Sequence, residues 1–196
     1  MRVSDLESKK WFTLACLFEL SLLVVAAVVV LLAGSSWDTD FQWRAGDALI
    51  GLGASLPMFW LFMRSLQSTQ RPCVEIRLAL EQTLGRIFRR FSILQLAVVS
   101  LLAGVCEEVL FRSVVQSGIA ETLGRGWGLL ISAGLFGLAH WITPFYALAT
   151  TAAGLYLGTL WLLTGNLLTP LLAHALYDFL ALVYFLRRHA RTAPLG

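Results

Sequence analysis

A small set of ionisable side chains interrupts the long apolar runs of this chain. A charged side chain at the centre of a membrane helix costs about 2.5 to 3.5 kcal/mol on insertion scales, so such residues are mostly retained for function. Two of the chain's three histidines belong to this set, together with one arginine. The members are Glu19, Glu107, Glu108, Arg112, His140, His174 and Asp178.

The first motif reads E-E-x-x-x-R at residues 107–112. Residues four apart share a face of a helix, so Glu108 and Arg112 are predicted to form an ion pair inside the protein. Glu107 is rotated by about 100° from Glu108 and therefore faces a different neighbour. One acid is thus expected to be neutralised by Arg112, which leaves the other free for chemistry.

Two further motifs place a histidine four residues from a partner. Residues 136–140 read F-x-x-x-H, and residues 174–178 read H-x-x-x-D. The same spacing rule places Phe136 beside His140 and His174 beside Asp178. A single such motif is weak evidence, because a histidine in a membrane helix can simply hydrogen-bond to a neighbouring helix. Three motifs in order, on three different apolar runs, favour a functional site.

Hydrolysis is the chemistry that fits these residue types. A carboxylate and a histidine can hold and deprotonate a water molecule, and a second histidine with Asp178 can stabilise a developing oxyanion. Alternatively, Glu107, His140 and His174 can bind a zinc ion that keeps an open position for water. No Ser–His or Cys–His nucleophile pairing is evident in the sequence. Cys106 is therefore expected to pack as a small hydrophobic residue.

Two features favour a site without a metal or another cofactor. The positive charge of Arg112 disfavours a dication nearby. The histidines also lack the H-E-x-x-H spacing that places two imidazoles on one helical face. We therefore expect a water molecule activated by glutamate, with zinc as the alternative.

The composition of the chain requires a membrane. Of the 196 residues, 58% are hydrophobic and 14% are charged. A water-soluble domain carries about 25% charged residues, so an ordinary soluble enzyme is excluded. The net charge is +3, but the basic residues lie between the apolar runs, where they act as topology signals rather than as a nucleic-acid-binding face. The three cysteines have no spacing typical of a disulfide framework or a zinc site.

Six apolar runs are each predicted to span the bilayer, which takes about 20 residues per helix. The expected fold is all-α, a polytopic membrane bundle of about six helices that forms a single integral-membrane domain over residues 1–196. The first run is longer than the apolar core of a signal peptide, about 7 to 15 residues, so we expect an uncleaved span. The predicted spans are residues 11–34, 45–63, 91–118, 127–142, 145–163 and 167–186.

The charges between the spans predict an orientation. The loop at residues 35–44 carries Asp38 and Asp40, whereas residues 64–90 and the C-terminal tail are rich in arginine. The positive-inside rule then places both termini in the cytoplasm, in a bacterial-type plasma membrane. Apolar residues are interleaved with the arginines of residues 64–90, so this stretch is either an amphipathic helix on the membrane surface or a plain basic loop.

These span boundaries place Glu107 and His140 at different depths in the bilayer. At 1.5 Å per residue, Glu107 lies about 24 Å from the inner end of its span, and His140 lies about 20 Å from the outer end of its own. In a hydrocarbon core of about 30 Å, those heights differ too much for the two residues to share a water molecule. We therefore expect the first of these spans to begin near Ala97 and the next one later than Trp127.

The ordered motifs resemble those of the CPBP family, the CAAX prenyl-protease-like and bacteriocin-processing intramembrane proteases, also called the Abi family. The resemblance covers residues 103–179 and implies a CAAX-protease-like core. It implies that Glu107 is the essential base and that His140 holds the water. It also implies that His174 and Asp178 lie on the side of the oxyanion.

The resemblance also implies supporting residues. Glu108 and Arg112 would hold the site together, and Phe136 would shape it. The third motif ends in Asp178, where the eukaryotic CAAX proteases have Asn. An ionised Asp cannot donate a hydrogen bond, which favours Asp178 as the residue that orients His174.

The expected function is that of an intramembrane endopeptidase that hydrolyses a peptide bond of a membrane-associated or lipidated protein. The resemblance implies a prenylated, leader-bearing or otherwise membrane-anchored peptide substrate, the lipid bilayer as surroundings, and no nucleic acid. Two other classes stay open: an ion- or proton-coupled transporter, and a non-catalytic immunity or scaffold protein. The transporter is disfavoured because the chain lacks two halves with matching broken helices, and the scaffold because all three motifs are intact.

Overall fold

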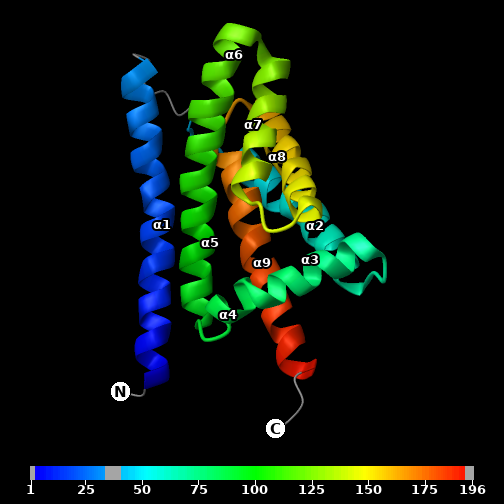
Figure 1. The fold of residues 1–196 in the computed structure, drawn as a ribbon. Helices are drawn as coiled ribbons and strands as arrows, with labels where there is room; N and C mark the ends of the chain where they lie inside the picture. Colours follow the sequence, from blue (N-terminus) through cyan, green and yellow to red (C-terminus); the bar gives the residue numbers. More distant parts are fainter. Residues whose placement is uncertain (1–2, 34–40, 193–196) are drawn as a thin grey trace.

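The structure is a computed structural model that describes residues 3–33 and 41–192, with side chains for residues 6–33 and 41–188. Within these residues the chain is helical and contains no strand, which confirms the all-α prediction. Asp38 and Asp40, which entered the prediction of orientation, lie outside the described residues. The helices, labelled in Figure 1, are α1 (Val3–Ala33), α2 (Ala45–Gln67), α3 (Arg71–Gln82), α4 (Leu84–Phe88), α5 (Ile93–Glu108), the π-helix η1 (Val109–Gln116), α6 (Ser117–Leu123), α7 (Arg125–Ala139), α8 (Pro144–Thr164) and α9 (Leu168–Thr192).

Five helical stretches are long and apolar enough to cross a membrane, and α7 is a shorter apolar helix of 15 residues. At 1.5 Å per residue α7 is about 22 Å long, less than a hydrocarbon core of about 30 Å. The polytopic membrane bundle is therefore confirmed, but the fourth of the six predicted spans, residues 127–142, corresponds to a helix that is not among the five long stretches. The five long stretches are Leu6–Ala33, Ala45–Gln67, Ile93–Leu123, Pro144–Thr164 and Leu168–Arg188.

Helix α9 lies at the centre of the bundle. It packs against α2, α5 and α8, and α7 packs against α8, α6 and η1. Helix α1 packs against α5 and η1 and stands at one side of the bundle, as Figure 1 shows. Helices α3 and α4 run across the lower part of the bundle, in front of α9 in that view. The arrangement brings α5, η1, α7 and α9 together, and these elements carry the three sequence motifs.

One continuous helical stretch of 31 residues, Ile93–Leu123, contains α5, η1 and α6. A capping box fixes its start: the Ser92 hydroxyl accepts a hydrogen bond from the Gln95 N–H, and the Gln95 side chain accepts one from the Ser92 N–H. The helix therefore begins at Ile93, and the expected start near Ala97 is wrong. Its middle part is a π-helix, a form that is often found at functional sites.

A tight turn at Gly124 brings the motif residues to the same level. Gly124 has a φ of +88°, which glycine adopts without a steric penalty. Helix α7 begins directly after this turn at Arg125, so the expected start later than Trp127 is wrong. Glu107 lies 17 residues before Gly124 and His140 lies 16 residues after it. The two arms of this helical hairpin therefore carry both residues to nearly equal heights.

The arginine-rich stretch between α2 and α5 forms helices α3 and α4. Their apolar side faces the bundle, where Leu80 lies in a buried cluster with Leu66 of α2 and Phe185 of α9. Arg77 donates a hydrogen bond to the Leu66 carbonyl oxygen at 2.9 Å. The structure thus has an amphipathic helix in this stretch rather than a plain loop.

Glycines allow close contacts between the helices around the motifs. A Cβ atom on Gly104 of α5 would lie 2.7 Å from the Ala175 Cβ of α9. A Cβ atom on Gly154 of α8 would lie 3.2 Å from the Ala133 Cα of α7. Small residues at such positions let helix backbones approach closely in a membrane. The side chains of α5, α7 and α9 can therefore meet in one place.

Candidate active site

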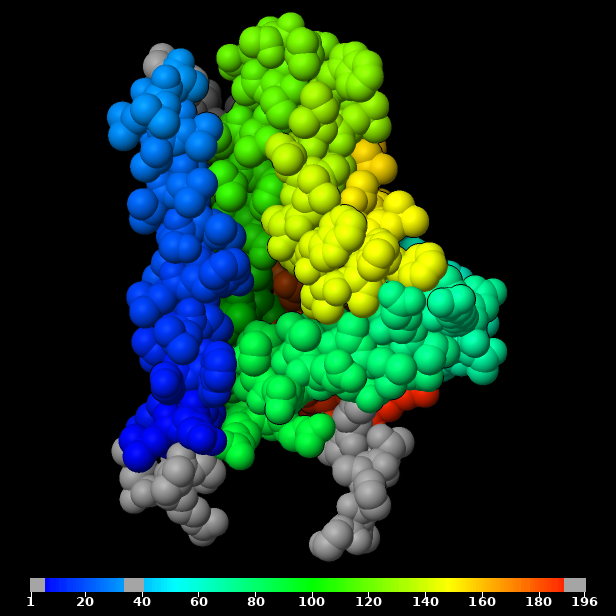
Figure 2. All heavy atoms as spheres, in the orientation of Figure 1, coloured from blue at the N-terminus to red at the C-terminus, as the bar shows by residue number. Residues whose placement is uncertain are grey.

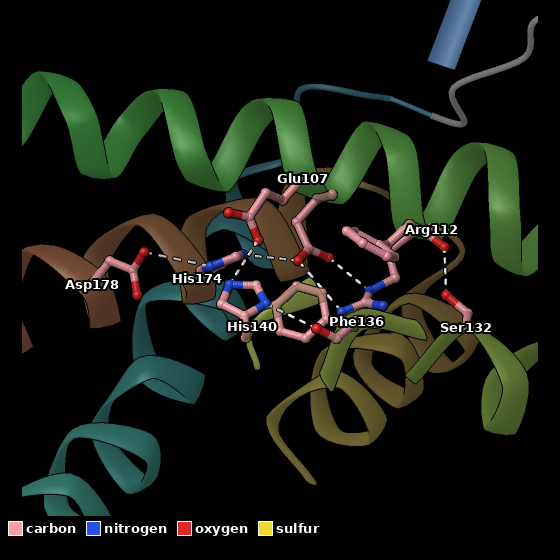
Figure 3. Close-up of polar contacts among 9 residues, drawn as sticks. Glu107, Arg112, Ser132, Phe136, His140, His174 and Asp178 are labelled. Atoms are coloured by element: carbon pink, nitrogen blue, oxygen red, sulfur yellow. Dashed lines mark hydrogen bonds and ion pairs between the residues drawn. The ribbon is translucent and has the colours of Figure 1, made fainter. Parts of the chain in front are cut away.

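Three helical arms bring the three sequence motifs together. The first motif spans the end of α5 and the start of η1, the second lies at the end of α7, and the third lies on α9. Figure 3 shows their side chains pointing toward one another. We call this group the motif cluster; it consists of Glu107, Glu108, Arg112, Phe136, His140, His174 and Asp178.

Glu108 joins two of the three motifs. One of its oxygens, Oε2, accepts a hydrogen bond from Arg112 Nε at 2.8 Å, so the predicted ion pair is present. The other oxygen, Oε1, lies 2.9 Å from Nδ1 of His174. Glu108 and Arg112 are fully buried, and His174 is 4% exposed. A buried charge is tolerated only when it is paired and hydrogen-bonded, and Glu108 meets both conditions.

Phe136 supports the same group from the α7 side. Its ring centroid lies 4.5 Å from that of His140 and 5.9 Å from that of His174. The Arg112 guanidinium carbon lies 5.2 Å from the Phe136 centroid, a cation–π arrangement. The Phe111 ring packs edge-on against the Phe136 ring, and their centroids are 5.0 Å apart. Phe136 thus fixes the positions of both histidine rings and of the arginine.

His140 and Glu107 face each other without a direct hydrogen bond. His140 Nδ1 lies 2.8 Å from the Phe136 carbonyl oxygen, which can only accept, so Nδ1 carries the hydrogen. Nε2 of the neutral ring is then an acceptor, and it lies 3.6 Å from Oε2 of Glu107. That oxygen is buried and has no hydrogen-bond partner among the described residues. Two acceptor atoms therefore face one small space.

His174 contacts a carboxylate on each side of its ring. Nδ1 meets Glu108 at 2.9 Å, and Nε2 lies 3.5 Å from Oδ2 of Asp178. Asp178 lies four residues further along α9, so the two side chains share a face as expected. The side chain of Asp178 is 30% exposed, in contrast to that of His174 at 5%. This arrangement orients the ring of His174 and provides acceptors for both of its N–H groups.

The described residues contain no group of three or more His, Cys, Asp or Glu side chains placed to hold a metal ion. For the zinc alternative, Glu107 and His140 lie close enough to be joint ligands. His174 would have to leave Glu108 or Asp178, because both of its nitrogens face carboxylates. The zinc ligand set predicted from the sequence would therefore require the His174 ring to turn away from one of these carboxylates.

The motif cluster is most accessible near His140 and Asp178. Their side chains are 27% and 30% exposed, whereas that of Glu107 is 9% exposed. In Figure 2, part of α9 is visible at the bottom of an opening between α5, the connection from α7 to α8, and the crossing helices α3 and α4. Water and a substrate can therefore reach the motif cluster where the side chains of His140 and Asp178 are exposed.

The sequence gives no signal for one contact of the site, and it assigns no role to Glu19. The contact of Glu108 with His174 joins residues 66 positions apart, and no spacing rule predicts such a contact. Glu19 of α1 was singled out as an intramembrane acid but received no role. Its side chain is buried, and Oε2 has no hydrogen-bond partner among the described residues. The available signal was its place as the one acid inside an otherwise apolar run.

Comparison with known proteins identifies the region that carries the site. Residues 89–180 match the family model described as Rce1-like, type II CAAX prenyl endopeptidase Rce1-like. Searches of curated proteins and of solved structures gave no match. The matched region contains all three motifs, so the resemblance to the CPBP proteases that the motifs indicated is confirmed.

Replacing Arg112 tests the support that the ion pair gives to the site. Arg112→Ala would leave Glu108 buried without its cation, and we expect a loss of about 3 to 5 kcal/mol in the free energy of unfolding. Thermal and denaturant unfolding of the purified protein in one detergent measures this loss.

The matched control for this substitution is Arg64→Ala, because Arg64 has an exposed side chain on α2. We expect its stability to stay within about 0.5 kcal/mol of the wild type. Equal stabilities of the two variants would contradict the structural role of the buried pair.

Proposed function

Because residues 89–180 form an Rce1-like domain of the CPBP protease family, we propose that this integral membrane protein is an intramembrane endopeptidase in which Glu107 and His140 activate a water molecule. The observation that carries the proposal is the geometry of this pair. A buried carboxylate oxygen without a hydrogen-bond partner faces, at 3.6 Å, an imidazole nitrogen whose acceptor state is set by the Phe136 carbonyl.

The proposed reaction is a direct attack by water. The water molecule donates one hydrogen bond to Oε2 of Glu107 and one to Nε2 of His140. Glu107 takes a proton as the water oxygen bonds to the carbonyl carbon of the peptide. That proton then passes to the leaving nitrogen as the C–N bond breaks, and Glu107 returns to its carboxylate form. The products are one new carboxyl terminus and one new amino terminus.

We assign the stabilisation of the oxyanion to His174. Its contact with Asp178 is long, 3.5 Å, so the Nε2–H can turn its hydrogen bond toward the oxygen of the scissile carbonyl group. The shorter contact with Glu108 holds the ring in place during this change. Asp178 then orients His174 and balances its charge, which is a role that an ionised Asp can perform.

A glutamate-activated mechanism without metal is the proposed type. The positive charge of Arg112 disfavours a dication nearby. In addition, both nitrogens of His174 face carboxylates. If zinc is present in the active protein, Glu107, His140 and His174 are the residues that would hold it. It would then supply Lewis-acid activation of the water.

The proposed substrate is a prenylated, leader-bearing or otherwise membrane-anchored peptide. The helices leave no separate soluble domain among the described residues, so the scissile bond has to come to the membrane-embedded site. We also propose a bacterial-type plasma membrane as the location. Cytoplasmic termini are supported by Arg71, Arg77 and Arg86, which lie in α3 and α4 on the side of the bundle where α1 begins.

Glu107→Gln tests the proposed base. The amide keeps the shape of the side chain but cannot take the proton, so we expect at least about a 100-fold loss of hydrolysis. The assay uses protein in liposomes, a farnesylated peptide that ends in a C-a-a-X motif, and mass spectrometry of the products. Membrane insertion and thermal stability should stay close to wild type.

Glu121→Gln provides the matched control, because Glu121 has an exposed side chain on α6. We expect this variant to cleave the peptide at the wild-type rate. Cleavage by the Glu107→Gln variant at the wild-type rate would contradict the assignment of Glu107 as the base.

Exhaustive chelation tests the metal-free mechanism. We expect the purified protein to keep its activity after chelation, with much less than one metal ion per chain by elemental analysis. Activity that disappears on chelation and returns with zinc, at about one zinc per chain, would instead make His140 and His174 metal ligands.

A further inference from the structure

The inner face of α1 carries one acid between two apolar contacts. Cys16 lies in a cluster with Val99 of α5, and Leu23 lies in a cluster with Val109 of η1. Glu19 is three residues after Cys16 and four before Leu23, so all three share one face of α1. Glu19 is thus directed at the stretch of α5 between these two contacts, which ends in Glu107 and Glu108.

Glu19 is buried at a position where an apolar side chain would be expected. Its exposed fraction is 8%, and its Oε2 atom is buried without a hydrogen-bond partner among the described residues. A buried polar atom without a partner is unfavourable for folding, so its retention needs another reason.

The other acids of the site already have their partners. Glu108 is shared by Arg112 and His174, and Asp178 faces His174. Glu107 faces His140 and is assigned to the water. Glu19 differs from these acids. Its Oε2 atom has no hydrogen-bond partner among the described residues, and the proposed hydrolysis gives it no role.

We propose that Glu19 is a further active-site residue, which positions the substrate by accepting a hydrogen bond from a main-chain N–H next to the scissile bond. This inference rests on the proposed function and deepens it, because it names the part of the substrate that α1 recognises. Glu19 acts on the substrate main chain and takes no part in moving the proton.

The chemistry of a peptide inside a membrane supports a main-chain partner. A peptide must be extended at the scissile bond before water can attack it, and its N–H groups then lack helical partners. An unpaired N–H group is costly in a water-poor environment, so it needs an acceptor from the enzyme. Glu19 provides one on the face of α1 that packs against α5 and η1, at the side of the bundle.

The test compares Glu19→Met, Glu19→Gln and Glu7→Leu in the liposome assay with the farnesylated C-a-a-X peptide. Met removes the acceptor and keeps the length of the side chain, so we expect KM to rise about 10-fold, with kcat within about two-fold of wild type. Gln keeps an acceptor oxygen and should restore KM to within about three-fold. Glu7 has an exposed side chain at the base of the same helix, and its variant should match the wild type.

A second readout does not depend on activity. Binding of the same peptide is measured on Glu107→Gln and on the double variant with Glu19→Met, where we expect an affinity about 10-fold lower in the double variant. The thermal midpoint of Glu19→Met should equal or exceed that of the wild type, because a buried atom without a partner has been removed. A merely structural role for Glu19 would lower this midpoint and leave KM unchanged.

The outcomes separate this inference from the proposed function. Cleavage by the wild type and its loss in Glu107→Gln support the protease assignment. Unchanged KM and affinity in the Glu19→Met proteins would then overturn the role of Glu19 alone. A Gln variant as impaired as the Met variant would also overturn it, since an acceptor is present. No cleavage by the wild type and no binding to Glu107→Gln would contradict both.

Discussion

The buried carboxylate of Glu108 is the interaction on which the rest of the site depends. Its two oxygens contact different partners, Arg112 at 2.8 Å on one side and His174 at 2.9 Å on the other. A charge without exposure to water is costly unless its hydrogen bonds are complete, so α5, η1 and α9 must meet at this point. Phe136 then adds α7, because its ring packs against Arg112 and both histidines.

The adjacent acids Glu107 and Glu108 have different roles, because Glu108 holds the helices together and Glu107 is the proposed base. Glu108 points toward Arg112 and α9, so Glu107, about 100° further round the helix, points toward His140 instead. The helical hairpin at Gly124 brings His140 to the height of Glu107, and Gly104 lets α9 approach α5 closely enough for His174 to reach Glu108. The positions of the site residues thus come from helix packing and from the buried Glu108–Arg112 pair.

Much of this site could be predicted from local spacing, because partners four residues apart share a helix face. The pairs Glu108–Arg112, Phe136–His140 and His174–Asp178 follow from that rule, and the apolar runs predict a helical membrane bundle. The contact of Glu108 with His174 depends on how α5 packs against α9, and no local rule contains that information. The heights of Glu107 and His140 were misjudged because each span was assumed to cross the whole bilayer. In fact α7 is short, and the helix before it continues to Leu123.

The measurement that tests this account most directly is a double-mutant cycle between Glu108 and His174. The free energy of unfolding is measured in one detergent for the wild type, Glu108→Gln, His174→Gln and the double variant. The account predicts a coupling of about 1.5 to 3 kcal/mol, as expected for a buried hydrogen bond to a charged group. Effects that add to within about 0.5 kcal/mol would contradict the claim that this contact holds the active site together.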